Sequence, residues 1–430
     1  MKRTLVAFFV LAFFNSSYAQ KIITSDIANF WMAYDSIQKT DGNKKVILQN
    51  LLLNKKSDGL KAFMEIKRFG EDDYLSAIEK YPKFWNSIRT NTLIDSKKIG
   101  NISKALKQLK KLYLHHSRGN IYYMIGTFKS GGTTNNEDLL LGIEKIVGDS
   151  NTIVSEFENA NLKKMFLFSH SSQLAQITVH EFVHTLQKDG EVNVLSKAIK
   201  EGSCDFIAEL SLNKKFSSSY LEYGFKNYDR IKSDFKKQML SQNFGNWFYN
   251  SETSEHADLG YFVGYAITKK YYENAKDKKA AIKSIIELAY NSETAVLDFL
   301  ANSRYFEEQI DVDNIRLAYK NSQPQVLKIT EFENGNQYVD PGTKKIQILF
   351  SKPMNDKVSV DFSKFGKEHF PLKNILGFDQ TKTILTLETT QLKPATEYDF
   401  YITDRATKSV DGYPFMEPSY KISFKTLGKN

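Results

Sequence analysis

The sequence has 430 residues, a single cysteine (Cys204) and a formal net charge of +9. One cysteine excludes an internal disulfide, so stability must come from the buried core and from any bound metal. The basic residues are spread along the whole chain, which disfavours nucleic acid as a partner and indicates general solubility instead.

The first 19 residues have the composition of an export signal. A basic start is followed by an apolar block over residues 5–14, and Ser17-Tyr18-Ala19 forms a small-x-small cleavage pattern. The apolar block is far shorter than the roughly 20 residues that cross a bilayer. We therefore expect cleavage near Ala19, an exported protein (periplasmic or extracellular), and no integral membrane segment.

The chain then alternates between helical and strand-like patterns. Apolar residues recur at helical spacing from Ser25 to about Leu114, from about Ser171 to Leu212, and from Leu259 to Ala289. Between the first two of these stretches, residues 120–127 (NIYYMIGT) predict a strand, and a turn-forming run of Ser, Gly and Thr follows it. The pattern predicts a helix-rich α+β domain.

From Val326 to the end, the pattern changes to short alternating runs separated by Pro, Gly, Asp and Asn. These runs are KITEF, KKIQILF, KVSVDF, TILTLET, EYDFYI and YKISFKT. They predict an all-β sandwich of about 100 residues. The segments IQILFSKPM, LKPATEY and DGYP resemble a bacterial Ig-like domain of exported and surface-layer proteins. The resemblance implies an accessory module, with a cell surface or matrix as its expected contact.

These patterns divide the chain into three parts. Residues 1–19 form the signal peptide, residues 20–320 the α+β domain, and residues 325–430 the sandwich. Within the α+β domain we expect a helical part at 20–117 and the residues that carry chemistry at 118–320.

His180-Glu181-Phe182-Val183-His184 lies in a stretch, residues 171–187, that contains no Gly or Pro. Residues four apart share one face of a helix, so both imidazoles can reach one ion, with Glu181 beside them. This is the HExxH spacing of zinc sites. The alternative is that both histidines are ordinary members of a helix surface or core.

A catalytic zinc needs a third protein ligand and an open position for water. Sixteen residues separate His184 from Glu201, which begins the run EGSCDFIAE, periodic enough for a second helix. Asp205 lies one turn later, where it can accept a hydrogen bond from the outer nitrogen of a ligand histidine. We expect one Zn2+ per chain. The neighbours of Cys204 favour a buried apolar role over zinc binding.

HExxH followed by ExxxD resembles the gluzincins, the thermolysin-like zinc peptidases, and EGxxD is similar to their EGxA motif. The spacer is slightly shorter than in the best-known members, so the loop between the two helices is expected to differ. The resemblance implies that His180, His184 and Glu201 are the zinc ligands. It also implies that Glu181 is the base and that Asp205 is the hydrogen-bond partner of a ligand histidine.

Residues 25–300 also resemble a bacterial family of predicted zinc-dependent proteases. The similarity is carried by GTFKSGGTT (126–134), the HExxH, EGxxDFIAE and DLGYFVGY (258–265). It implies a zincin-like fold and a class of reaction, but no particular substrate.

The ligand types predict how a peptide bond would be hydrolysed. A zinc ion held by two imidazoles and a carboxylate brings the pKa of its water towards ~7, and Glu181 can move the proton to the leaving amine. Tyr261, Tyr265 and His256 are candidate donors to the oxyanion. Tyr261 and Tyr265 would equally suit simple packing on a helix.

The strand over 121–127 and its loop are candidates for substrate binding. An edge strand beside the zinc would pair with an extended peptide, and Gly131, Gly132 and Thr133 would allow its close approach. A tight turn without any such role is the alternative.

We therefore expect a secreted zinc metallopeptidase that acts on a peptide or protein substrate. The main alternative is an exported binding or adhesion protein with a structural or relict zinc site, and a second is hydrolysis of another amide. No residue identifies a pocket for a free amino terminus, so endo- and exopeptidase action both stay open.

Overall fold

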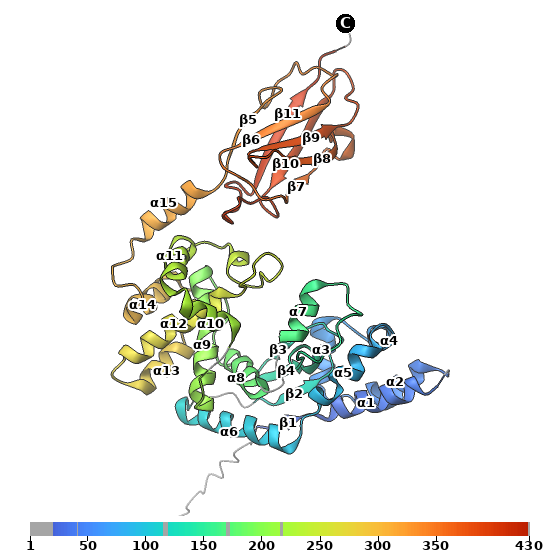
Figure 1. The fold of residues 1–430 in the computed structure, drawn as a ribbon, viewed down its shortest axis with the longest axis vertical. Coiled ribbons are helices and arrows are strands. Elements are labelled where there is room, and N and C mark those ends of the chain that lie inside the picture. The colour runs from blue at the N-terminus through green and yellow to red at the C-terminus, as the bar shows by residue number, and fades with distance from the viewer. Residues whose placement is uncertain (1–19, 41, 115–118, 169–172, 216–217, 429–430) are drawn as a thin grey trace, which may run out of the picture.

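The computed structural model describes residues 20–40, 42–114, 119–168, 173–215 and 218–428. The expected signal peptide lies outside these residues. Within them the architecture is α+β: helices and a small sheet come first, and two further sheets follow α15 (Figure 1). This confirms the predicted order of a helix-rich part followed by a β part.

Six helices form the N-terminal part, as the periodicity predicted. Side chains of Asn43, Ser57 and Asp95 cap three of them by accepting a backbone N–H, which satisfies donors that the first turn leaves free. The helices are α1 (Ser25–Gln38), α2 (Lys44–Leu51), α3 (Asp58–Lys67), α4 (Glu71–Lys80), α5 (Pro82–Thr92) and α6 (Ser96–Leu112).

A four-stranded sheet lies beside these helices, in the order β1-β2-β4-β3. Strands β1 and β2 and strands β2 and β4 pair in parallel, whereas β3 pairs with β4 antiparallel. The bounds are β1 (Ile22–Ile23), β2 (Ile121–Met124), β3 (Gly132–Asn135) and β4 (Asp138–Gly142).

The sheet order corrects the prediction of which strand is the edge. The strand predicted over 120–127 is β2, which is shorter and lies inside the sheet, with all four residues buried. A continuous apolar run is typical of a buried parallel strand. The edges are β1 and β3, and β3, which includes Gly132 and Thr133 of the predicted turn, is polar and only partly buried.

The loop between β2 and β3 is held by a buried carboxylate. Glu144 lies in a short 3-10 helix, η2 (Ile143–Lys145), and is 0% exposed. Its carboxylate accepts the N–H of Gly126 at 3.0 Å and that of Phe128 at 2.8 Å. Thr127 and Phe128 have positive φ, so this carboxylate compensates for an unusual backbone path towards β3.

Glu144→Ala should lower the free energy of unfolding by about 2–4 kcal/mol, because the buried N–H of Gly126 and the partly buried N–H of Phe128 lose their acceptor. Chemical denaturation measures the change. The matched control is Glu158→Ala, at an exposed position, which should change stability by less than about 0.5 kcal/mol. Equal stability of both variants would contradict a supporting role for Glu144.

The second half of the helical part is built around α9, most of whose residues are buried. Helix α8 packs on one side of α9, and α12 crosses it closely. A Cβ on Gly202 would lie 2.0 Å from the Tyr265 backbone nitrogen of α12, so only glycine fits at this crossing. The helices are α7 (Ala160–Phe168), α8 (Leu174–His184), α9 (Val194–Leu212), α10 (Ser219–Lys226), α11 (Tyr228–Gln238), α12 (Leu259–Asn274), α13 (Lys278–Ile286), α14 (Glu293–Ser303) and α15 (Val312–Ser322).

The C-terminal part, called here the β-domain (residues 326–426), has two sheets that share a core. One has the order β5-β6-β9-β8 and the other β11-β10-β7. Their buried apolar residues form a cluster separate from that of the helical part. The strands are β5 (Val326–Ile329), β6 (Lys345–Phe350), β7 (Ser359–Asp361), β8 (Leu372–Phe378), β9 (Ile384–Thr389), β10 (Glu397–Thr403) and β11 (Ser419–Lys425).

Six of these strands overlap the predicted runs, β5 by only two residues, and β8 was missed. Its pairing with β9 is interrupted by two register shifts, and its middle residues are exposed. Bulges break the alternation of apolar and polar residues on which strand prediction depends.

None of the described helices is long and apolar enough to span a membrane.

Candidate metal centre

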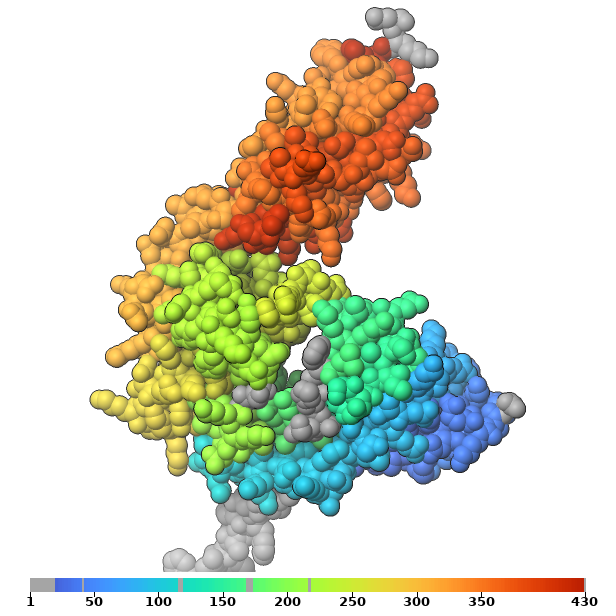
Figure 2. Space-filling view, viewed as in Figure 1, coloured from blue at the N-terminus to red at the C-terminus, as the bar shows by residue number. Residues whose placement is uncertain are grey.

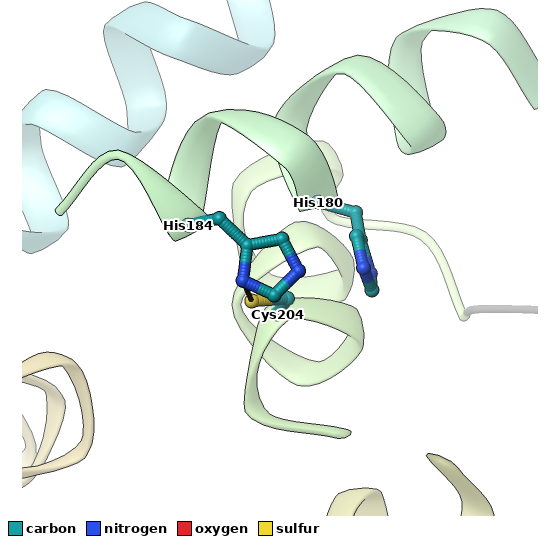
Figure 3. A group of neighbouring side chains, drawn as sticks. All are labelled: His180, His184 and Cys204. Carbon is teal, nitrogen blue, oxygen red and sulfur yellow. Dashed lines mark hydrogen bonds between the residues drawn. The ribbon is translucent and has the colours of Figure 1, made fainter. Parts of the chain in front are cut away.

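Helices α8 and α9 bring two histidines and a glutamate together. His180 and His184 lie one turn apart on α8 and project towards α9 (Figure 3). Their Nε2 atoms lie 3.7 Å and 3.3 Å, respectively, from Oε2 of Glu201, which is 7% exposed. Three donor atoms of the types that zinc prefers therefore converge from two helices.

The outer nitrogens of both rings are occupied by hydrogen bonds. Nδ1 of His180 lies 2.7 Å from Oδ1 of Asp205, whose other oxygen accepts from the Tyr220 hydroxyl at 2.8 Å. Nδ1 of His184 lies 2.8 Å from Oε1 of Gln187. Carboxylate and amide oxygens accept, so each Nδ1 carries a proton and each Nε2 is the ring nitrogen that faces Glu201.

Gln187 is a site residue that sequence reasoning missed. Its amide nitrogen donates to the Lys200 carbonyl, to Ser203 Oγ and to the Tyr290 hydroxyl at 2.9–3.1 Å. These partners orient the amide so that its oxygen faces His184. A signal existed in the spacing, because a residue three positions after a helical histidine lies near it.

Charges within the cluster determine its pKa values. Burial alone would lower the pKa of His180, but the charge and hydrogen bond of Asp205 outweigh it and raise that pKa well above its usual value. Burial would raise the pKa of Glu201, yet its bonds to the two histidines hold it far below the usual range. Glu201 is therefore ionised, as a metal ligand must be.

Cys204 offers a second donor set. Among the described residues, donor atoms of His180, His184 and Cys204 lie within 4.8 Å of one another, and Figure 3 places the sulfur beside the His184 ring. However, the thiol approaches Nδ1 of His184, at 3.4 Å, where Gln187 is already bound. Burial, followed by the charge of Glu201, also raises the pKa of the Cys204 thiol well above its usual value.

Glu181 lies against the edge strand β3. A Cβ on Gly132 would lie 2.9 Å from Oε2 of Glu181, so the carboxylate lies directly against this strand. Gly131 precedes the strand and Thr133 lies within it. The structure thus brings the predicted loop to the predicted base, although as an edge strand rather than as a turn.

The predicted oxyanion donors lie in three different places. The Tyr261 ring is 6.2 Å from that of His180 and nearly parallel to it. The Tyr265 hydroxyl donates to Glu209 at 2.8 Å, eight residues beyond Glu201 and so about 12 Å further along α9. His256 stacks on Tyr223. Only Tyr261 of the three lies next to a predicted ligand.

Tyr249 is a further neighbour that sequence reasoning missed. It has φ +54°, which is unusual for a bulky residue, and its N–H donates to Oδ1 of Asp258 at 2.6 Å. The residue is 71% exposed, yet its hydroxyl lies close enough to that of Tyr261 for each to shift the pKa of the other. Desolvation of the hydroxyl, followed by the charge of Glu201, raises the pKa of Tyr249 to about 12. No sequence pattern marked this position.

The surface is hollowed on the face of the molecule that Figure 2 shows. Figure 2 shows a depression between the green segment around α7 and the yellow-green segments around α10 and α11. Figure 1 places α8 and α9 in the same region of the molecule.

Comparisons with known proteins identify no family. No protein-family model matches the chain, and no curated protein matches it. A solved structure, the N-terminal part of the bacterial S-layer protein SbsC, aligns over 76% of this chain and 78% of its own, with 11% identity and a TM-score of 0.19. That score is too low to indicate a shared fold.

Proposed function

We propose that this protein is an exported zinc metallopeptidase of the gluzincin type, with a zincin-like domain at 20–320 and an Ig-like accessory domain at 325–430. One observation carries the proposal. Both Nε2 atoms face the Glu201 carboxylate while both Nδ1 atoms are held by acceptors. Histidines held in this way are prepared to bind a metal.

His180, His184 and Glu201 would hold one Zn2+ per chain, leaving a position for water. Zinc bound there would acidify a water molecule and polarise a peptide carbonyl. Asp205 and Gln187 keep both imidazoles in the binding tautomer. Glu181 accepts the proton of the attacking water and delivers it to the leaving amine.

The surroundings of Glu181 suit an extended peptide substrate. Strand β3 ends its sheet and lies against Glu181 through Gly132, so a substrate strand that pairs with β3 passes the base. The hydroxyls of Tyr261 and Tyr249 are the candidate donors for the oxyanion, because the Tyr220 hydroxyl is bound to Asp205 and the Tyr265 hydroxyl to Glu209.

The test is digestion of a broad peptide library by the full chain. We expect one zinc per chain by elemental analysis, cleavage products by mass spectrometry, loss of cleavage with a chelator, and recovery when zinc is restored. The Cys204 donor set favours a second candidate, a binding protein with a structural zinc site. Bound zinc with no cleavage of any peptide would support that candidate, and absence of metal binding would contradict both.

A further inference from the structure

The β-domain is hydrogen-bonded to the segment that leads to Tyr249, and this contact is called here the grip. A turn of the β-domain, residues 408–414, faces the short 3-10 helix η4 (Phe244–Asn246) that follows α11. The Gly412 carbonyl accepts from Nδ2 of Asn243 at 2.9 Å and from Nδ2 of Asn246 at 2.8 Å. In the opposite direction, Nζ of Lys408 donates to Oδ1 of Asn243 at 3.1 Å. Figure 1 shows the β-domain adjoining this region through α15.

The turn itself is firmly built. The Ser409 backbone N–H donates to the Tyr413 carbonyl at 2.9 Å, and the Gly412 N–H donates to the Ser409 carbonyl at 2.9 Å. Gly412 has φ +84°, and a Cβ there would lie 2.7 Å from Nδ2 of Asn246. The backbone conformation therefore favours glycine, and a side chain there would displace the Asn246 amide.

The gripped segment continues directly to Tyr249. The N–H groups of Trp247 and Phe248 both donate to the Phe244 carbonyl at 2.9 Å, and the Trp247 carbonyl accepts from Gly260 of α12. Phe248 is buried, with its ring 5.8 Å from that of Tyr261. A shift of η4 is thus transmitted through a packed, hydrogen-bonded segment to the backbone of Tyr249.

We propose that the β-domain positions Tyr249 at the metal centre through the contact of Gly412 and Lys408 with Asn243 and Asn246. The β-domain is then a working part of the catalytic unit rather than only a spacer. Gly412 and Lys408 are positioning residues, because neither touches the site itself. The role assigned to Tyr249 rests on the proposed function, whereas the mechanical grip does not.

Two variants test the grip from the β-domain side and leave the helical part unchanged. Gly412→Ala pushes against Asn246, and Lys408→Met removes the donor to Asn243 while keeping most of the side chain's volume. The matched control is Gly335→Ala, which places alanine at φ +90° elsewhere in the β-domain, with nothing within 4 Å of the new Cβ. Hydrogen exchange of the peptide spanning 244–250 measures the local stability of this segment independently of catalytic activity.

We expect faster exchange over 244–250 in Gly412→Ala and Lys408→Met, unchanged exchange in Gly335→Ala, and unchanged zinc content in all three. We expect kcat for peptide hydrolysis to fall roughly 10- to 100-fold in the first two variants, since misplacement of a group by about 1 Å has costs of this order. Unchanged exchange over 244–250 in both variants would overturn the grip, whether or not the protein is a peptidase.

A double variant separates positioning from general damage. If the β-domain acts through Tyr249, Tyr249→Phe combined with Gly412→Ala should be no slower than the slower single variant, because both remove the same interaction. If the loss of kcat in the double variant equals the product of the two single losses, the β-domain does not act through Tyr249. If wild type hydrolyses no peptide but the exchange result is as expected, the grip stands and the proposed function fails.

Discussion

Glu181→Gln should leave zinc bound and lower kcat for peptide hydrolysis by about 10²- to 10⁴-fold, the range that a positioned proton-transfer group contributes. The amide is nearly isosteric with the carboxylate, so it occupies the same place beside Gly132. It cannot accept the proton of the attacking water. The measurement pairs single-turnover kinetics with elemental analysis of the same sample.

Glu65→Gln is the matched control for this experiment, because Glu65 is an exposed glutamate on α3. It should hydrolyse peptides at the wild-type rate. If Glu181→Gln keeps both its zinc and its activity, Glu181 is not the base. If it loses zinc, the carboxylate contributes to binding and the proposed division of roles is wrong.

Glu201→Ala should abolish hydrolysis and weaken zinc binding. The loss in affinity should exceed the roughly 10- to 100-fold that loss of an outer hydrogen-bond partner costs. Cys204→Ser should retain both. The reason is directional: Glu201 faces the two Nε2 atoms, whereas the Cys204 thiol faces the nitrogen of His184 that is bound to Gln187. Competition with a chromogenic chelator measures both affinities.

The two variants also decide between the two donor sets. Loss of zinc in Cys204→Ser with retention in Glu201→Ala would assign the metal to His180, His184 and Cys204, and a structural site would follow. Because Cys204 and Glu201 are buried in α9, thermal unfolding in the presence of chelator must show that each variant is folded before its affinity is interpreted.

Local spacing was the part of this protein that the sequence could predict. His180 and His184 are one turn apart on a single helix, and Glu201 and Asp205 are one turn apart on the next. Each pair shares a face because of the 3.6-residue period alone. The same short-range regularity predicted the N-terminal helices and six of the seven strands of the β-domain.

Positions that depend on contacts between distant segments were decided only by the tertiary structure. Nothing in the local pattern showed that β3 would form the edge beside Glu181, or that Tyr265 would face Glu209 instead of the histidines. Tyr249 reaches Tyr261 through a left-handed backbone held by Asp258. The grip of the β-domain on η4 joins residues more than 160 positions apart. Periodicity describes which face of an element is apolar, but the partner of that face depends on packing across the whole chain.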